Sequence, residues 1–181
     1  MTDKLWEDLK EELMLGVTQK GHPFRFCTFA SVETKNSPQM RTVVLRHISA
    51  ELNPIFYTDK RSQKVLEIKK NNKASLLFYN PEKLLQIKIV GRASALNDPQ
   101  RIKGLWAEVP ENNKKDYTTH LAPGTFIDNP DEVEYLADKN YFCPVEIEPH
   151  KIEYLKLKRP NHIRASFLKE NGSWEGKFMV P

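Results

Sequence analysis

Cysteine and glycine are scarce in this chain, and long apolar runs are missing. The 181 residues include two cysteines and seven glycines, and no stretch approaches the roughly 20 apolar residues of a membrane-spanning helix. Cys27 and Cys143 are far apart, each in an apolar run, so we expect small buried side chains and no disulfide. The scattered glycines form neither a Rossmann fingerprint nor a P-loop, which excludes those two kinds of phosphate site.

The sequence also gives little support for a metal site or a nucleic-acid site. The net charge is only +4, and the basic clusters are scattered without interleaved aromatic residues, so we expect no nucleic-acid partner. The histidines lack metal-ligand spacing with one another or with cysteine; they are His22, His47, His120, His150 and His162. Residues 1–13 are acidic and amphipathic, unlike a signal peptide, which predicts a cytoplasmic protein without a membrane partner.

Alternating apolar residues and frequent turn signals predict a mainly β (α+β) protein with flanking helices, in one domain over 1–181. We expect helices at 3–15, 62–70 and 98–109, and strands at 24–32, 40–48, 55–58, 74–79, 85–96, 141–148, 151–157, 164–168 and 174–180. Residues 110–140 read as a long polar loop with one short helix. A loop of this length is commonly functional, so we expect it to approach a ligand or a partner subunit.

Several residues predict where elements begin, bend or end. Gly16 suits the position just after a helix, and Gly91 a bulge within a strand. Ser62 suits a helix N-cap, and Asp98 followed by proline predicts another helix start. Asn129 before a proline predicts the start of the short helix, and the Asn-Gly pair at 171–172 predicts a tight hairpin.

Cations crowd one predicted helix start, where the partial positive charge of the helix makes them unfavourable. Lys60, Arg61 and Lys64 lie beside the hydroxyls of Thr58 and Ser62. A bound phosphate would satisfy all five side chains together with the free N–H groups of the helix. The alternative is three solvated surface cations, each costing about 0.3–1 kcal/mol.

Three motifs in order carry a family resemblance. The chain reads RTVVLR at 41–46, YTDKRSQK at 57–64 and LLFYNPEKLLQIKIVG at 76–91. Over 25–97 it resembles the pyridoxamine 5′-phosphate oxidase-like family of FMN-binding split barrels. The resemblance implies an antiparallel FMN-binding split β-barrel with flanking helices, a homodimer with FMN at its interface, and oxidoreductase activity on a small substrate.

The resemblance also implies which residues bind FMN, and leaves the catalytic residues unknown. Phosphate contacts would come from Arg41, Thr58, Ser62 and Lys64. The family often has an arginine at the position of Gln63, and Arg61 would supply that positive charge here. Contacts to the ring would come from the backbone of Val43, Val44 and Leu45, from the side chains of Arg46 and Gln86, and from packing by Tyr57.

The two arginines of the first motif raise a geometric difficulty. In a regular strand Arg41 and Arg46 point to opposite faces of the sheet. Both can serve one ligand only if the strand departs from regularity or if the ligand straddles the strand edge.

The chain departs from the family pattern near its C-terminus. Leu155 stands near the place of a family tryptophan, and His162, Arg164 and Ser166 fall where Arg, His and Arg are expected. Residues 105–116 contain no counterpart of the family's tyrosine and arginine that hold the substrate phosphate. These departures predict weak binding of pyridoxamine phosphate. Two alternatives stay open: a non-catalytic flavin-holding or sensing protein, and a barrel that binds RNA or another polyanion.

Overall fold

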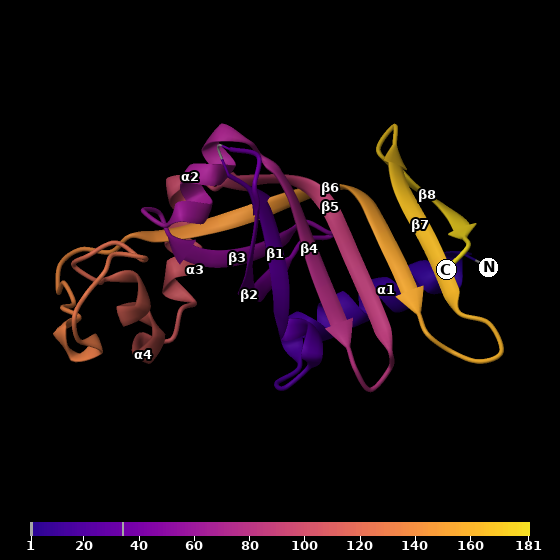
Figure 1. Ribbon diagram of the computed structural model, residues 1–181, viewed down its shortest axis with the longest axis horizontal. Helices are drawn as coiled ribbons and strands as arrows, with labels where there is room; N and C mark the ends of the chain where they lie inside the picture. Colours follow the sequence, from indigo (N-terminus) through magenta and orange to yellow (C-terminus); the bar gives the residue numbers. More distant parts are fainter. Residues whose placement is uncertain (1, 34) are drawn as a thin grey trace.

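Six antiparallel strands form a closed barrel, and two more strands extend its sheet (Figure 1). The computed structural model describes residues 2–33 and 35–181. The strands follow the order β3-β2-β1-β4-β5-β6-β7-β8, and a further pairing of β3 with β6 closes the barrel. Their bounds are β1 Phe26–Val32, β2 Pro38–Ile48, β3 Pro54–Asp59, β4 Lys73–Asn80, β5 Leu85–Ala95, β6 Phe142–Lys156, β7 Ile163–Glu170 and β8 Ser173–Met179. This architecture confirms the predicted fold class.

Alternate residues of the strands fill the barrel interior. On β4 and β5 alternate side chains are buried, as the period of two predicts, and all of them except Asn80 are apolar. Across the barrel, the rings of Phe29 and Phe56 pack with centroids 4.9 Å apart. Cys27 and Cys143 are buried in the same core as free thiols, as expected. Burial raises the pKa of Cys27 to about 12 and that of Cys143 to about 11, so both stay protonated.

Helix α1 (Thr2–Thr18) packs its apolar stripe on the barrel and on the β7–β8 hairpin. Trp6 stacks against Phe167 at 4.9 Å and Trp174 at 5.2 Å. The predicted helix end at Gly16 is wrong, because α1 continues past it. Gly16 is needed for another reason: a Cβ there would lie 2.8 Å from the Cβ of Phe24.

The strand expected at 24–32 begins later, because His22 caps a 3₁₀ turn, η1 (Pro23–Arg25). The two strands expected at 141–148 and 151–157 are one strand, β6. Pro149 does not interrupt it, since it lies opposite Gly91 where the register between β5 and β6 shifts. The predicted bulge at Gly91 is thus confirmed, and a Cβ there would lie 2.2 Å from the carbonyl oxygen of Glu148.

The remaining helices lie near one end of the barrel. They are α2 (Gln63–Lys70), α3 (Pro99–Ala107), α4 (Glu111–Lys114), η2 (Lys115–Tyr117) and η3 (Pro130–Glu132). Asp98 and Asn129 cap their helices as predicted, and Asn171 and Gly172 both have positive φ in the β7–β8 turn. No helix in the described part of the chain is long and apolar enough to cross a membrane.

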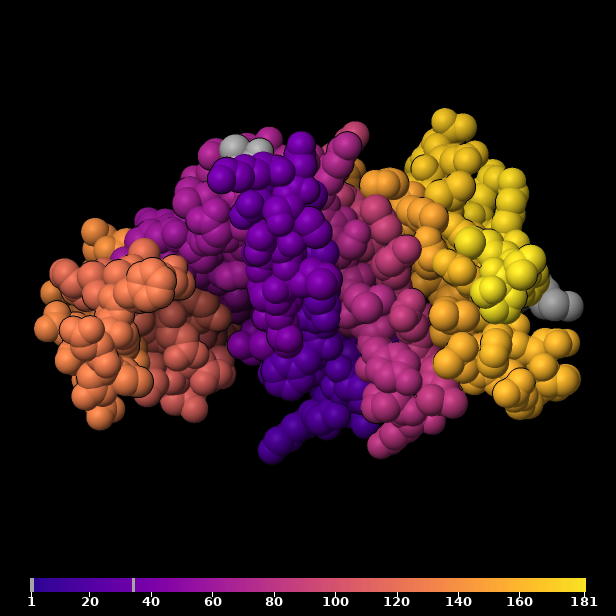
Figure 2. Space-filling model, viewed as in Figure 1, coloured from indigo at the N-terminus to yellow at the C-terminus, as the bar shows by residue number. Residues whose placement is uncertain are grey.

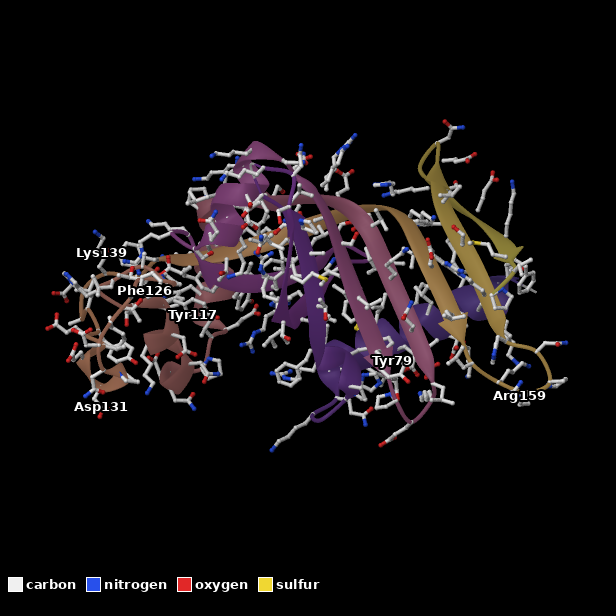
Figure 3. All side chains as sticks on the ribbon, in the orientation of Figure 1. Tyr79, Tyr117, Phe126, Asp131, Lys139 and Arg159 are labelled. Carbon is white, nitrogen blue, oxygen red and sulfur yellow. The ribbon has the colours of Figure 1, made fainter. Side chains whose placement is uncertain are left out.

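The segment 110–140 protrudes beside the barrel (Figure 2). It contains three short helices where the sequence predicted one. A second apolar cluster holds its base, built on Val109, Tyr117 and Phe142 with Trp106 packed against them. Farther out lie side chains such as Phe126, which is fully exposed (Figure 3).

Candidate functional site

The predicted phosphate contacts on β3 and α2 lie together. The hydroxyl oxygens of Thr58 and Ser62 are 3.2 Å apart and buried, and Lys64 Nζ donates to Thr58 Oγ1 at 3.1 Å. Ser62 occupies the N-cap position of α2 but makes no capping hydrogen bond with its side chain. Its hydroxyl therefore stays in the cluster with Thr58.

Lys64 is a partly buried cation. Its pKa is lowered, first by burial and next by the positive charge of Arg41. Arg41, on β2, reaches α2 through its ion pair with Glu67, three positions after Lys64, so two different elements bring these cations together. An anion between these side chains would relieve both effects.

A carboxylate already lies at this place. Glu67 on α2 accepts hydrogen bonds from Arg41 Nη2 at 3.0 Å and from the Ser31 hydroxyl through its Oε2 atom. Glu67 is buried, and its second oxygen, Oε1, has no partner. The Arg41 guanidinium, which also lies 5.6 Å from the ring of Phe29, is thus partly neutralised by the protein itself.

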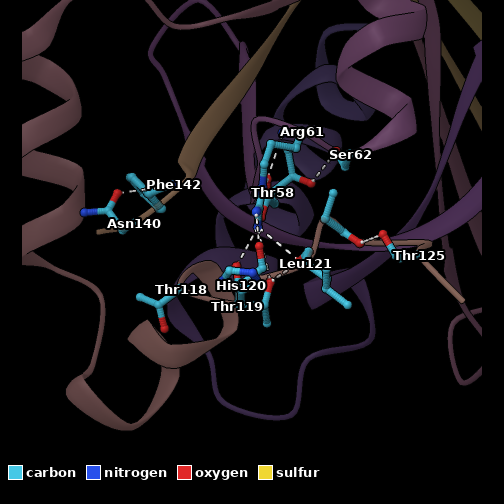
Figure 4. A network of polar contacts seen from close by, with 12 residues as sticks. Thr58, Arg61, Ser62, Thr118, Thr119, His120, Leu121, Thr125, Asn140 and Phe142 are labelled. Carbon is cyan, nitrogen blue, oxygen red and sulfur yellow. Dashed lines mark hydrogen bonds and ion pairs between the residues drawn. The ribbon is translucent and has the colours of Figure 1, made fainter. Parts of the chain in front are cut away.

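Arg61 contacts Asp59 and the segment 119–121, which is distant in the sequence (Figure 4). Its guanidinium donates to both carboxylate oxygens of Asp59, at 3.1 and 2.7 Å. It also donates at 2.9 Å to the carbonyl oxygens of Thr119 and His120, and it stacks 3.3 Å from the ring centroid of Tyr141. Arg61 thereby joins the start of α2 to the protruding segment 110–140, and its charge is opposed by Asp59.

Strand β2 departs from regularity beside the predicted ring contacts. The register between β2 and β3 shifts between Leu45 and His47, which makes Arg46 the irregular position. An irregularity of this kind is one of the two ways in which Arg41 and Arg46 could serve the same ligand. Arg46 lies 5.7 Å over the ring of Tyr57 on β3, and its Nε atom is buried without a hydrogen-bond partner. Val43 and Leu45 face the barrel interior, and Val44 faces outward.

Gln86 does not lie with the other predicted contacts. It is on β5, and β1 and β4 separate that strand from β2. Three strand spacings correspond to about 14 Å along the sheet. Across the neighbouring strands Gln86 pairs with Leu155, and Leu155 with Arg164. The predicted site therefore falls into two groups within one chain, a β2–β3–α2 group and a β5–β6–β7 group.

Three polar side chains near this site were not predicted from the sequence. His47 Nε2 lies 2.7 Å from the Tyr57 hydroxyl and 3.2 Å from Glu108 Oε2. Glu67 is the third, through its pair with Arg41. A histidine directly after the first motif was a signal, but no pattern connects it with Glu108, sixty-one positions further along the chain.

The donor set in the β2–β3–α2 group fits the phosphate of FMN. It combines two buried hydroxyls, a lysine, an arginine and the start of an eight-residue helix, which are the groups that bind phosphate in proteins. The Arg46 guanidinium, over the ring of Tyr57, adds a cation beside the predicted ring contacts. Glu67 opposes an anion at this place, because its carboxylate pairs with Arg41.

Comparisons with known proteins identify the family of the chain. The family model described as pyridoxamine 5′-phosphate oxidase, FMN-binding domain, matches residues 4–97, which include most of α1 and all three motifs. Pyridoxine/pyridoxamine 5′-phosphate oxidase of Legionella pneumophila is 33% identical over 97 residues, which span 54% of this chain and 42% of that protein. The enzyme of the same name from Acinetobacter baumannii is 26% identical over 170 residues, covering 85% of this chain and 77% of its own.

Solved structures share the whole fold. A pyridoxamine 5′-phosphate oxidase-related, FMN-binding protein from Nostoc punctiforme superposes with a TM-score of 0.79 at 19% identity, covering 97% of this chain and 96% of its own. PhzG from Burkholderia lata, solved with tetrahydrophenazine-1-carboxylic acid, also has a TM-score of 0.79 at 19% identity, covering 99% and 92%. The chain therefore belongs to the pyridoxamine 5′-phosphate oxidase FMN-binding family, and its cofactor is FMN.

Proposed function

We propose that this protein is an FMN-dependent oxidoreductase that acts on a small substrate. The observation that carries the proposal is the convergence of Thr58, Ser62 and Lys64, with Arg41 beside them, at the start of α2. These residues would hold the FMN phosphate through charge-assisted hydrogen bonds. When bound, the flavin ring supplies the redox chemistry, so the chain itself needs no nucleophile.

The irregular end of β2 would hold the flavin ring. We propose that the backbone of 43–45 and the side chain of Tyr57 contact the ring, with the Arg46 guanidinium near its edge. A cation at that place would stabilise negative charge on the reduced ring. For Arg61 we propose a different role, in which it fixes residues 119–121 beside the cofactor site.

We also propose a homodimer in which a second copy completes the site. Within one chain, Gln86 lies apart from the β2–β3–α2 group. A second copy would therefore have to bring its Gln86 to the flavin ring. The outer face of β2, β1 and β4 favours this arrangement because it exposes large apolar side chains: Phe26 (58%), Met40 (73%), Leu77 (37%) and Tyr79 (48%). Such a face is typical of a protein contact, and soluble oligomers are commonly two-fold dimers.

Two organisational proposals accompany this function. Residues 1–181 would act as one FMN-binding domain, since β6 connects the barrel to the β7–β8 hairpin. The protein would work in the cytoplasm, where free thiols such as those of Cys27 and Cys143 persist.

A flavin titration and a turnover assay test the proposal together. We expect the purified protein to show flavin absorbance and, with FMN bound, to oxidise NAD(P)H or another small substrate while an acceptor such as oxygen is reduced. Absence of FMN binding, with or without turnover, would reject the assignment of the phosphate site. Tight FMN binding without turnover of NAD(P)H, pyridoxamine phosphate or any tested acceptor would favour a flavin-holding or sensing protein.

A further inference from the structure

A pocket of about 240 Å³ opens beside the predicted ring contacts. The end of β2 contributes Arg46 and His47, β3 contributes Tyr57, and Glu108 at the end of α3 completes the polar part of the lining. Tyr57 and Arg46 are also predicted cofactor contacts, so a molecule in this pocket would lie next to the flavin. The pocket therefore has the position of a substrate subsite.

The hydrogen bonds in the pocket give Tyr57 a direction. His47 Nε2 lies within reach of both the Glu108 carboxylate and the Tyr57 hydroxyl, at 3.2 and 2.7 Å. An ionised carboxylate only accepts hydrogen bonds and repels a lone pair on Nε2, so the His47 proton is placed on Nε2, where Glu108 and Tyr57 share it. The Tyr57 oxygen then accepts from Nε2, and its own proton is free to point into the pocket.

The Tyr57 hydroxyl also keeps its proton. Burial first, and the charge of Glu108 next, raise the pKa of Tyr57 to about 12, although Arg46 acts in the opposite direction. The Arg46 guanidinium also lines the pocket and contributes further N–H donors. The pocket thus offers donors from two residues to an acceptor group on a ligand.

The charges that line the pocket favour one negative charge on that ligand. Arg25 and Arg46 contribute +2 and Glu108 contributes −1, which leaves +1 from these three side chains. A carboxylate would balance this charge. A phosphate dianion would leave an excess negative charge next to the Glu108 carboxylate, which is unfavourable.

We propose that this pocket binds the carboxylate of a small organic substrate, which accepts hydrogen bonds from Tyr57 and Arg46. His47 and Glu108 act as positioning residues that direct the Tyr57 proton toward the substrate. The proposal rests on FMN binding at the adjacent site and adds to it the chemical class of the substrate.

Titrations of the FMN-loaded protein with benzoate and with phenyl phosphate test the charge preference. The two probes share a ring and differ in charge, and flavin absorbance reports their binding. We expect saturable binding of benzoate, weaker binding of phenyl phosphate, and about tenfold weaker benzoate binding in Tyr57→Phe. Tighter binding of phenyl phosphate, displacement of FMN by benzoate, or an unchanged Tyr57→Phe would each overturn the proposal. If FMN binds and benzoate does not, only this inference fails; if FMN does not bind, the proposed function fails first.

A second variant tests the positioning role with a readout that general destabilisation would not reproduce. Glu108→Gln removes the negative charge, so we expect phenyl phosphate to gain at least fivefold over benzoate. Glu111→Gln, in which the exposed partner of Lys114 is changed outside the pocket, should keep the preference of the parent protein. Nitrogen NMR of the FMN-free protein should find the His47 proton on Nε2. A proton on Nδ1, or an unchanged preference in Glu108→Gln, would contradict the role of Glu108.

Discussion

Arg41 and Glu67 form an ion pair at the end of the barrel, with Arg41 Nη2 3.0 Å from Glu67 Oε2. The carboxylate is almost fully buried, and the arginine is about one quarter exposed. The pair lies where the FMN phosphate is predicted to bind, so Glu67 and the phosphate would share one guanidinium. This competition gives the first of the following predictions.

Glu67→Gln should tighten FMN binding while lowering the stability of the protein. The amide keeps a hydrogen-bond acceptor for Arg41 but removes the negative charge that opposes the phosphate. We expect about tenfold stronger FMN binding by fluorescence titration, which corresponds to about 1.4 kcal/mol. Loss of one partner of a buried ion pair is destabilising, so the urea midpoint without FMN should fall. Weaker or equal FMN binding would mean that Glu67 does not oppose the phosphate.

Lys64→Ala and Arg41→Ala should each weaken FMN binding by about 1.5–3 kcal/mol, the range for hydrogen bonds to charged groups. Lys64→Ala is the cleaner test, because Arg41→Ala also leaves Glu67 unpaired. Lys69→Ala changes an exposed lysine of the same helix and serves as the control. Equal FMN affinity in all three variants would remove the phosphate assignment.

Arg61→Ala should release residues 119–121 with a smaller effect on FMN than Lys64→Ala. The guanidinium holds this segment through the carbonyl oxygens of Thr119, His120 and Leu121. We expect hydrogen exchange to accelerate at 118–122 and to stay unchanged in β4 and β5. A loss of FMN affinity as large as that of Lys64→Ala, with normal exchange, would instead support a direct phosphate contact.

Glu153 should make stability depend on pH in the acid range. Burial alone would raise its pKa, but hydrogen bonds from Lys151, Lys88 and Arg164 lower it to about 2. A carboxylate with a lowered folded-state pKa stabilises the protein above its unfolded pKa of about 4.3. This stabilisation is lost as the pH falls from there toward 2.

The comparison with Glu153→Gln isolates this contribution. We expect the variant to be less stable than the parent at pH 7 in urea unfolding, and the difference to shrink steadily below pH 4. A difference in stability that stays constant from pH 7 to pH 3 would show that the charge of Glu153 does not stabilise the protein through the three cations.

Met40→Glu should reduce dimerisation if the outer face of β2, β1 and β4 contacts a second copy. The new charge would be buried without a partner in that contact, which is unfavourable. Light scattering after gel filtration would report a smaller mass than for the parent protein. Leu66→Glu places the same charge on an exposed position of α2 outside this face and should keep the parent mass. A monomeric parent protein would contradict the dimer directly.

Local signals in the sequence predicted much of the fold. Alternation and turn residues indicated the strands, and Asp98 and Asn129 marked helix starts that the structure contains. Errors arose where packing between distant segments overrides local preference. Gly16 stays helical because Phe24 needs the space beside it, and Pro149 stays in a strand because it meets the bulge at Gly91.

The sequence motifs predicted which residues belong to the candidate site, but not which side chains pair with one another. The hydroxyls and the lysine of 58–64 lie together because they surround a single helix start, which a local reading of the sequence can identify. The partners of the arginines come from elsewhere in the fold. Glu67 meets Arg41 only because α2 packs across the barrel end, and Glu108 meets His47 only because α3 ends beside β2.

The long strand β6 has a consequence for how the polypeptide can be divided. It pairs with β5 along one side and with β3 along the other, so it fills the gap between two strands that come much earlier in the chain. A fragment truncated after residue 97 would contain the three motifs at 41–46, 57–64 and 76–91, yet it would leave two unpaired sheet edges, which invite aggregation. Cofactor loading should thus have to wait for synthesis of the C-terminal third.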